Sequence, residues 1–297
     1  MKNSKYKRGV LTNMLAVITV GAGIYANTVA YYTLEDGFAG NDITATADAS
    51  GNGYTAGNWS GNESAAKYSS EVGGAYVYDP VDNTYRANTL SFQSQAGAVS
   101  NDCMLIGTGA GNNSGLNSGN FTYEMFIKVT DSSGGATSIG SEVVRLFNLD
   151  GSSYLNMRSS YQQARATQSG VGLSANMQAW SGSKDLDDGL WHHLAVTLSY
   201  DEAGGTSTIS MYYDYELLGS ATDTAVTGPF NPYNDLRFGI ADEAGGDLNW
   251  YFDEARLSDT VLSNSDFLKL TAVPEPASLA LISLGGLVML GIRKLRV

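Results

Sequence analysis

The sequence predicts an all-β protein whose antiparallel strands form a two-sheet jelly-roll sandwich. Stretches that alternate between apolar and polar residues recur along the chain, and glycine-rich turns separate them, with 35 glycines against only 5 prolines. An alternation of period two is typical of strands that are buried on one side. Residues 31–270 show no long helical period, and the absence of alternating strands and helices excludes a parallel α/β sheet.

The predicted strands follow one another at short intervals. They are expected at residues 31–36, 74–78, 89–92, 104–107, 120–130, 143–148, 154–158, 171–175, 189–200, 207–213, 236–240 and 250–257. The run Asp48-Ala49-Ser50-Gly51-Asn52-Gly53 predicts a tight turn, because glycine and asparagine tolerate positive φ. Residues 51–65 and 107–119 are expected to be loops, and residues 263–270 a helical turn. No linker interrupts this region, so residues 31–272 are expected to form one domain.

Two of the strands are long enough for their faces to be assigned. The first is expected to place on one face Phe121, Tyr123, Met125, Ile127 and Val129, and on the other Thr122, Glu124, Phe126 and Lys128. The second is expected to place on one face His192, Leu194, Val196, Leu198 and Tyr200, and on the other Trp191, His193, Ala195, Thr197 and Ser199. Both are therefore predicted to be core strands.

His192 and His193 are the two histidines of the chain. Successive side chains of a regular strand point to opposite faces, so this pair cannot chelate one metal ion. Metal sites also usually need three or four ligands, and the sequence offers no further histidine and no cysteine cluster. We expect both histidines to have a packing role.

The charge of the chain is unevenly distributed. Seven of the 17 basic residues lie in residues 1–30 and 277–297, which contain no acidic residue, so the region between them carries ten basic and 30 acidic residues. Such an acidic surface repels phosphate backbones and disfavours nucleic acid as a partner, but it suits calcium or a neutral glycan. Cys103 is the single cysteine, so no internal disulfide is possible, and we expect it to be a small buried apolar residue.

Residues 1–30 have the parts of a secretory signal peptide. Four basic residues precede an apolar run at residues 10–24, and Thr28-Val29-Ala30 suits cleavage before Tyr31. The alternative is a permanent N-terminal membrane anchor, which the short run with its Thr12-Asn13 interruption disfavours. The sequence thus predicts an N-terminal signal helix and an exported protein.

The stretch Val273-Pro274-Glu275-Pro276 separates the domain from a distinct C-terminal segment. Its prolines block continuation of a helix from the domain. The sixteen uncharged residues 277–292 follow, and as a helix they would reach about 24 Å, slightly less than a hydrocarbon core of ~30 Å. We expect a short transmembrane helix, whose basic end at residues 293–297 stays in the cytoplasm.

This C-terminal arrangement closely resembles the PEP-CTERM sorting signal of Gram-negative bacteria that make exopolysaccharide. The resemblance covers residues 273–297, with Pro274, Glu275 and Pro276 as the motif and Arg293, Lys294 and Arg296 in the basic end. It implies recognition by an exosortase, a membrane cysteine protease that removes the tail and passes the protein to the cell surface or extracellular matrix. The alternative is a plain C-terminal anchor.

The preceding region resembles the laminin-G-like, concanavalin A-like domains. Five segments carry the resemblance, and they occur in the family's order. The first is residues 31–36 with 48–53, the second is residues 121–128, similar to F-T-x-E-x-W-x-K with Phe126 in place of Trp, and the third is residues 189–195, similar to G-x-W-H-H-V-A. The fourth is the hairpin at 209–220, and the fifth is residues 236–240 with 251–257, similar to L-x-I-G and F-x-G-x-I-D-E-V-R-I-Y. The resemblance implies a concanavalin A-like jelly roll in which the histidine segment is structural.

Asp214 and Glu216 form a candidate catalytic pair of carboxylates. Glycoside hydrolysis requires two carboxylates across the scissile bond, and on a strand these two would share a face. Related jelly-roll glucanases, however, carry a Glu-x-Asp-x-x-Glu strand that is absent here, and the hairpin resemblance puts the pair at a turn. We therefore expect no enzyme, with a glycoside hydrolase as the minor alternative.

The family resemblance suggests Glu35 and Asp253 as ligands of a structural calcium ion, the one cofactor that it implies. Carboxylates and loop carbonyls are the hard oxygen ligands that calcium prefers. The alternative is that both side chains only accept hydrogen bonds from the backbone or water.

A glycan site would use exposed aromatic rings that stack on sugar faces, and four in loop-like contexts are candidates: Trp59, Tyr54, Trp180 and Tyr233. Each by itself is better explained by packing. The sequence as a whole predicts an exported, exosortase-sorted surface or matrix protein that binds glycan or exopolysaccharide without catalysis. A structural matrix protein without a specific ligand is the alternative.

Overall fold

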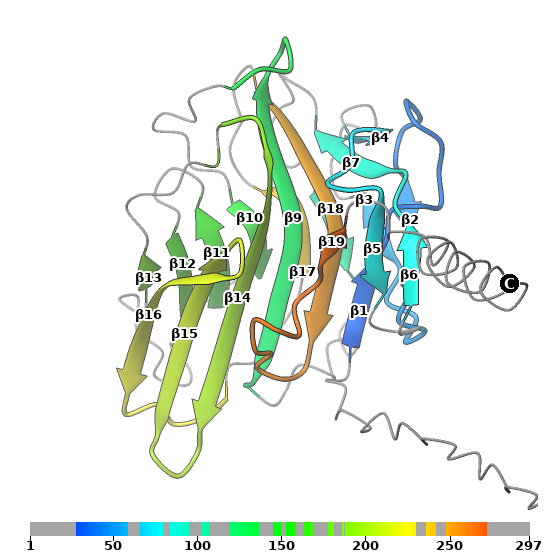
Figure 1. The fold of residues 1–297 in the computed structure, drawn as a ribbon. Helices are drawn as coiled ribbons and strands as arrows, with labels where there is room; N and C mark the ends of the chain where they lie inside the picture. Colours follow the sequence, from blue (N-terminus) through cyan, green and yellow to red (C-terminus); the bar gives the residue numbers. More distant parts are fainter. Residues whose placement is uncertain are drawn as a thin grey trace, which may run out of the picture.

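The described strands of the protein pair antiparallel throughout and form three sheets (Figure 1). The computed structural model describes residues 28–58, 66–79, 84–94, 103–106, 119–136, 145–149, 153–158, 163–168, 178–180, 186, 188–229, 236–241 and 248–271. The predicted all-β, antiparallel class is confirmed.

Sheet A contains the longest strands and is the central layer. In order across the sheet, its strands are β16 (Glu216–Thr224), β15 (Thr206–Tyr213), β14 (Trp191–Asp201), β9 (Phe121–Asp131), β18 (Leu248–Ser258), β7 (Ser91–Ser94) and β4 (Ala66–Ser69). An eighth strand, β1 (Thr28–Tyr32), also pairs with β18. The edge of β18 is therefore divided, with β7 along its first half and β1 along its second.

Sheet B lies behind sheet A in Figure 1. Its strands, in order, are β13 (Gln178–Trp180), β12 (Gln163–Gln168), β11 (Ser153–Arg158), β10 (Arg145–Leu149), β17 (Leu236–Ala241), β8 (Cys103–Ile106), β3 (Ala56–Asn58) and β2 (Ala45–Thr46). β12 and β13 contact β15, and β17 contacts β18, so the two sheets face each other as a sandwich.

Sheet C is a small third layer on the opposite side of sheet A. It consists of β19 (Leu270–Thr271), β5 (Tyr76–Asp79) and β6 (Thr84–Ala87), and in Figure 1 it lies in front of sheet A near β18 and β1. An apolar cluster fills the space beneath it and includes Tyr31, Val77, Phe126 and Leu268. The molecule thus has two layers of packing, one on each face of sheet A.

The faces of the two long strands are those that the alternation predicts. The main hydrophobic cluster contains the predicted inward residues Phe121, Tyr123, Met125, Ile127 and Val129 of β9, together with Leu194, Val196 and Leu198 of β14. Phe126 points the other way, into the cluster under sheet C. Residues 259–268 also cover this outer face, and Leu262 and Phe267 pack there against Ala195.

Several element boundaries differ from the prediction. β1 begins at Thr28, inside the predicted signal segment, and ends at Tyr32, because Leu34 adopts a positive φ of 59° that a strand cannot accommodate. Residues 263–266 form a turn, closed by the bond from Asp266 N to Ser263 O, and β19 follows it. The short strands β2, β3, β4, β6, β12 and β13 were not predicted, and β16 was expected only as the second strand of the hairpin at residues 209–220.

Other predictions fall on parts of the chain that are not described. These are the strand at residues 171–175, most of the signal segment, and all of the C-terminal segment from residue 272 onward. Within the described ranges, no helix is long and apolar enough to span a membrane.

Candidate functional site

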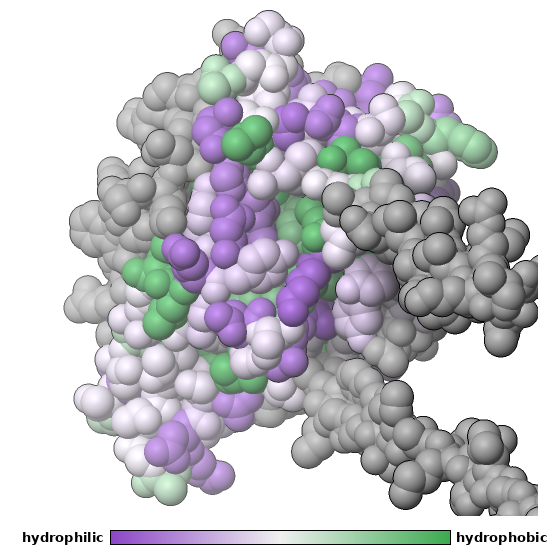
Figure 2. Space-filling model, viewed as in Figure 1, coloured by the Kyte–Doolittle hydropathy of each residue, from purple (hydrophilic) through white to green (hydrophobic). Residues whose placement is uncertain are grey.

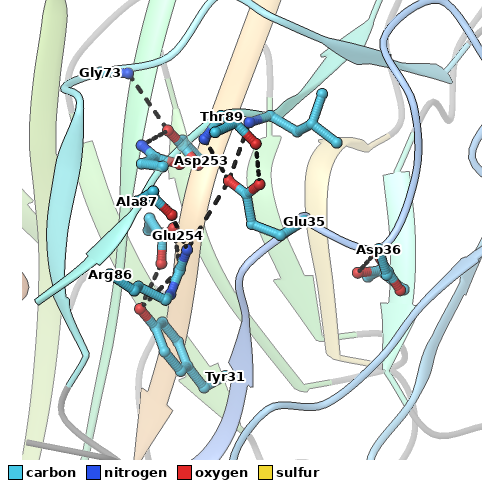
Figure 3. Close-up of polar contacts among 12 residues, drawn as sticks. Tyr31, Glu35, Asp36, Gly73, Arg86, Ala87, Thr89, Asp253 and Glu254 are labelled. Atoms are coloured by element: carbon cyan, nitrogen blue, oxygen red, sulfur yellow. Dashed lines mark hydrogen bonds and ion pairs between the residues drawn. The ribbon is translucent and has the colours of Figure 1, made fainter. Parts of the chain in front are cut away.

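A β-bulge in β18 turns two consecutive carboxylates to the same side of sheet A. In the register with β9, Asp253 lies opposite Phe126 and Arg256 opposite Glu124, so β18 has one extra residue here. Glu254 takes up the irregularity with a φ of 53°, which is unfavourable for a residue with a side chain. Asp253 and Glu254 both contact residues of the sheet C layer (Figure 3), and neither is exposed to solvent.

Glu254 is held by an arginine and a tyrosine from two other elements. Arg86 of β6 donates from Nη2 to Glu254 Oε1, and Tyr31 of β1 donates its hydroxyl to Oε2. The same guanidinium lies 5.8 Å from the centre of the Tyr31 ring and donates from Nη1 to the carbonyl of Ala87. This cluster joins β18, β1 and β6, and it therefore ties sheet C to sheet A.

The electrostatics of the two carboxylates follow from their burial. Burial raises the pKa of Glu254 to about 7, although Arg86 and Tyr31 oppose the rise. Burial, reinforced by the neighbouring charge of Glu254, raises the pKa of Asp253 well above its usual value. A buried carboxylate without a cation favours its protonated form, so Arg86 and a proton on Asp253 together bring the cluster towards neutrality.

Asp253 forms a second pair with Asn88, which follows β6. Asn88 Nδ2 donates to Asp253 Oδ2 over 2.7 Å, and the backbone N of Gly73 lies 3.4 Å from the same oxygen. The other two oxygens, Asp253 Oδ1 and Asn88 Oδ1, are buried without a hydrogen-bond partner in the protein. Two such oxygens fit the donor set of a hard cation. The described residues contain no group of three or more His, Cys, Asp or Glu side chains placed around a metal.

Glu35, the other predicted calcium ligand, points to a different set of donors (Figure 3). Its Oε1 accepts from the backbone N of Thr89 at 2.6 Å and of Leu90 at 3.0 Å, and its Oε2 accepts from the Thr89 hydroxyl. Its carboxylate lies 3.9 Å from Arg86 Nη1. The structure therefore groups Asp253 with Asn88, and it places Glu35 as an acceptor for the loop before β7.

The two histidines lie on opposite faces of β14, as predicted, and each contacts carboxylates. His192 stacks on Tyr213, and its Nδ1 and Nε2 lie 2.9 Å from Asp214 and 3.0 Å from Asp188. Burial by itself lowers the pKa of His192, but the hydrogen bonds to Asp214 and Asp188 outweigh it and raise the pKa. Only the imidazolium form can donate to both carboxylates.

His193 belongs to a buried network beneath residues 259–268. Its Nε2 lies 2.8 Å from Glu124 Oε2, and Glu124 also accepts from Arg256 and, at 2.8 Å, from the backbone N of Leu268. Burial raises the pKa of Glu124, but Arg256 and His193 reverse this and hold the pKa below its usual value. The ring of His193 stacks on Tyr215 at 4.6 Å. His193 thus combines ring packing with a hydrogen bond to Glu124, while Arg256 forms the ion pair to that carboxylate.

Asp214 lies at the hairpin turn between β15 and β16, and Glu216 begins β16. Asp214 and Tyr215 have φ of 47° and 69°, which is typical of the two-residue turn whose twist matches its strands. The carboxylate of Asp214 accepts from the backbone N of His193 at 2.9 Å as well as contacting His192. Asp214 thus fixes the hairpin onto β14, which is a structural use of that carboxylate.

A row of partly exposed side chains crosses the outer face of sheet A. Neighbours in register, one from each of five strands, make up this outer row: Trp191, Lys128, Tyr251, Gln93 and Lys67. Lys128 is the one residue of β9 between Phe121 and Thr130 that is not fully buried, so the row is a narrow exposed strip. Figure 2 shows this side of the molecule, where hydrophilic and apolar side chains lie side by side.

The side chains of the outer row contact one another. The rings of Trp191 and Tyr251 are 6.3 Å apart, and Lys128 Nζ lies 6.0 Å from the centre of the Tyr251 ring. Gln93 Nε2 donates to the Tyr251 hydroxyl at 3.3 Å, and Lys128 pairs with Glu71 at 2.8 Å. The outer row therefore places aromatic faces beside amide and charged groups on neighbouring strands of one sheet.

The aromatic residues predicted for glycan binding are placed differently. Tyr54 is partly buried against the main cluster, and its backbone accepts from Tyr32 and donates to Asp48. Trp180 ends β13, but its side chain lies outside the description, as do Trp59 and Tyr233 entirely. The side chain of Cys103, on β8, also lies outside it. The outer row was not predicted, because its residues come together only through the strand order.

The residues of the sorting signal also lie outside the described ranges. They are Pro274, Glu275, Pro276, Arg293, Lys294 and Arg296. Residues 272–296 match the PEP-CTERM protein-sorting motif. That motif indicates an exported protein that is sorted while anchored in the membrane of a Gram-negative bacterium.

Comparison with solved structures agrees with the sandwich fold. The binding domain of Paraclostridial Mosquitocidal Protein 1 is 11% identical with a TM-score of 0.52, and the likeness covers 81% of this chain and 50% of that one. The receptor-binding domain of botulinum neurotoxin D is 13% identical with a TM-score of 0.50, covering 81% and 51%. The chain thus spans about half the length of these structures, and the likeness shows the fold alone. No curated protein matches the sequence.

The sequence of the body itself matches one family model. Residues 106–266, more than half of the chain, match the model described as the concanavalin A-like lectin/glucanases superfamily. The match includes all of β9, β14 and β18, the strands whose alternation and motifs carried the resemblance. The chain therefore belongs to the concanavalin A-like lectin/glucanase superfamily, with a PEP-CTERM sorting motif at its C-terminal end.

Proposed function

We propose that the protein is processed by an exosortase, reaches the cell surface or extracellular matrix, and there binds an envelope glycan or exopolysaccharide without catalysis. The sorting motif supports the route, and the superfamily, which includes lectins, supports the ligand class. The observation that carries the binding part is the outer row. It combines two aromatic rings, an amide and two lysines on a rigid sheet, where little ordering is needed before a sugar binds.

The Tyr251→Ala variant tests the binding surface. Tyr251 is central in the outer row and contacts Trp191, Lys128 and Gln93. Its removal deletes a stacking face, so affinity for the best glycan should fall by about tenfold or more. The measurement is a glycan array with purified exopolysaccharide fractions, followed by calorimetric titration of residues 28–272 and of the variant.

Tyr85→Ala is the matched control for that experiment. Tyr85 is another tyrosine, 53% exposed, but it lies on β6 of sheet C, away from the row. Equal losses in both variants would contradict the outer row as the site. A wild-type protein that binds no glycan saturably would instead favour a structural matrix role. Release of reducing sugar that is lost in Asp214→Asn or Glu216→Gln would favour a glycoside hydrolase.

We also propose a structural calcium ion, with Asp253 and Asn88 as its side-chain ligands in place of the predicted pair of Asp253 and Glu35. The support is the pair of buried oxygens that lack a donor. A calcium ion there would stabilise Asp253 in its ionised form and offset the cost of burying that charge. Glu35 contributes less to this proposal, since its carboxylate oxygens already accept three hydrogen bonds.

Thermal unfolding tests the calcium proposal. Calcium at about 100 times its Kd should stabilise the folded state by ~2.7 kcal/mol, and chelator should reverse the rise in Tm. The effect should grow with pH, because calcium competes with the proton on Asp253. Asn88→Leu should abolish the response, while Glu35→Gln should largely keep it. A Tm that neither calcium nor chelator changes would show that the site holds no calcium.

A further inference from the structure

We propose that β19 is a releasable strand that controls removal of the C-terminal segment. In this proposal β19 has to unpair from β5 before the membrane protease can take up the Pro274-Glu275-Pro276 segment. The folded sandwich with β19 in place is therefore a slowly processed form. The inference rests on the proposed exosortase processing and adds a structural requirement to it.

The sorting motif follows the folded domain without a spacer. β19 ends at Thr271, and the motif match begins at residue 272. Ala272 and Val273 alone separate β19 from Pro274. Two extended residues reach about 7 Å, whereas a domain of this length has a radius of gyration of roughly 18 Å. The body of the sandwich therefore lies against any enzyme that engages Pro274 while β19 remains paired.

The backbone of β19 is already engaged by the domain. Leu270 pairs with Val77 and Thr271 with Tyr76, and the backbone N of Tyr78 donates to the carbonyl of Lys269 at 3.2 Å. Leu270 also packs into the cluster under sheet C. Its side chain lies so close to Gly73 that a Cβ built on that glycine would be 2.4 Å from Leu270 Cδ1. The chain is thus held by the domain up to β19.

A peptide-binding enzyme needs these same backbone groups. An extended peptide is usually held through main-chain hydrogen bonds to a strand edge. Pro274 and Pro276 have no N–H, so the motif offers few donors of its own. The N–H groups immediately before the motif belong to Ala272, Val273 and the two residues of β19. Release of β19 therefore frees backbone N–H groups for hydrogen bonds to the enzyme, and it also lengthens the free chain between the domain and Pro274.

The packing sets how far release can proceed. Leu268 is 1% exposed, its N donates to Glu124 at 2.8 Å, and its carbonyl accepts from the Tyr215 hydroxyl at 3.1 Å. β19, by contrast, is two residues long, half-buried and at the edge of sheet C. Peeling should therefore stop after Leu268. It frees Lys269, Leu270 and Thr271, which adds about 10 Å to the tether.

A disulfide between β5 and β19 tests the proposal in the full chain, expressed in a bacterium with an exosortase. Tyr76→Cys with Thr271→Cys joins two residues that are directly opposite in register. Antiparallel partners are about 4.5–5.5 Å apart at Cα, within the disulfide range, and the oxidising periplasm forms the bond. Cys103→Ser is included in every variant to prevent mispairing. Processing is followed by pulse-chase and the mass shift.

The stapled chain should be processed about tenfold or more slowly than either single-cysteine variant, since the released population is removed. Reductant should restore the rate. Inserting about eight Gly and Ser residues between Thr271 and Ala272 should also restore it with the disulfide intact, because such a linker spans ~15 Å. Equal rates for stapled and single-cysteine chains would overturn the proposal, and so would a stapled chain that the insertion fails to rescue.

A loosened strand provides the opposite test. Leu270→Ala weakens the packing of β19 and should speed processing by about threefold or more. Leu262→Ala, in the separate cluster around Phe267, is the matched control for general destabilisation and should not speed it. Replacement of Pro274, Glu275 and Pro276 by Ala separates the two proposals. If that variant is processed normally, exosortase sorting fails and this inference with it; if it is blocked while the staple has no effect, only the inference fails.

Discussion

His192 has a carboxylate at each ring nitrogen, so its protonation determines how tightly the β15–β16 hairpin is held to β14. The contact to Asp214 reaches the turn of the hairpin, and the contact to Asp188 reaches the loop before β14. The Trp-His-His sequence predicted the split of the two histidines between faces. It could not reveal their partners, because the strand order of sheet A brings Asp214 and Glu124 to β14, and the fold of the loop before β14 brings Asp188.

Asp214→Asn should destabilise the protein at pH 6, because it weakens the charge-assisted contact to His192 and the bond from the backbone N of His193. The side chain of Asp214 is 45% exposed, so after allowance for solvent screening the loss should be about 1 kcal/mol. Asparagine keeps the positive φ of 47° accessible. Chemical denaturation with Glu216→Gln as the control measures this, and equal losses in both variants would contradict the role of Asp214.

At the scale of elements, the sequence is most informative where strands are long and regular. The alternation of β9 and β14 predicts which side chains enter the main cluster, and the structure confirms it. β12 has few apolar residues and β13 is only three residues long, so their pairing rather than a periodic composition makes them strands. Strands this short or this polar give no periodic pattern that a sequence could be searched for.

β18 shows the opposite case, in which a regular pattern misleads. Strict alternation would place Asp253 and Glu254 on opposite faces, whereas the bulge places both beneath sheet C. The positive φ of Glu254 is the physical reason for the bulge, and a glutamate at this position does not indicate a positive φ from the sequence. The partners Arg86 and Asn88 come from β6 and the turn after it, more than 160 residues away in the chain. The outer row depends on register in the same way.

At the scale of the whole molecule, buried polar groups join the layers that apolar packing brings together. Arg86 and Tyr31 bind Glu254 and hold sheet C to sheet A. Glu124, bound by Arg256 and His193, holds residues 259–268 on the same face. The outer layers therefore depend on the protonation of a few groups in a way that the main cluster does not.

The free energy of unfolding should fall as pH rises from about 5 to 8. The pKa of Glu254 is about 7 in the folded protein and ~4.3 in an unfolded chain. Between these values the folded state binds more protons than the unfolded state, so ionisation costs stability, on the order of 3 kcal/mol in total. The pKa of His192 is also raised, so its contribution is complete below about pH 6.5 and is lost as pH rises through its folded pKa.

Urea denaturation at half-unit pH intervals separates the two contributions. Glu254→Gln should flatten the curve between about pH 4.5 and 7, since the glutamine oxygen can accept from Arg86 and its NH2 can donate to the Tyr31 hydroxyl oxygen, but the side chain does not titrate. His192→Gln should leave that part unchanged and flatten the curve above about pH 6.5. The double variant should keep only the fall that Asp253 contributes, since burial raises the pKa of that carboxyl well above its usual value. A wild-type protein whose stability increases steadily from pH 5 to 8 would contradict the assignment, because both groups act in the opposite direction.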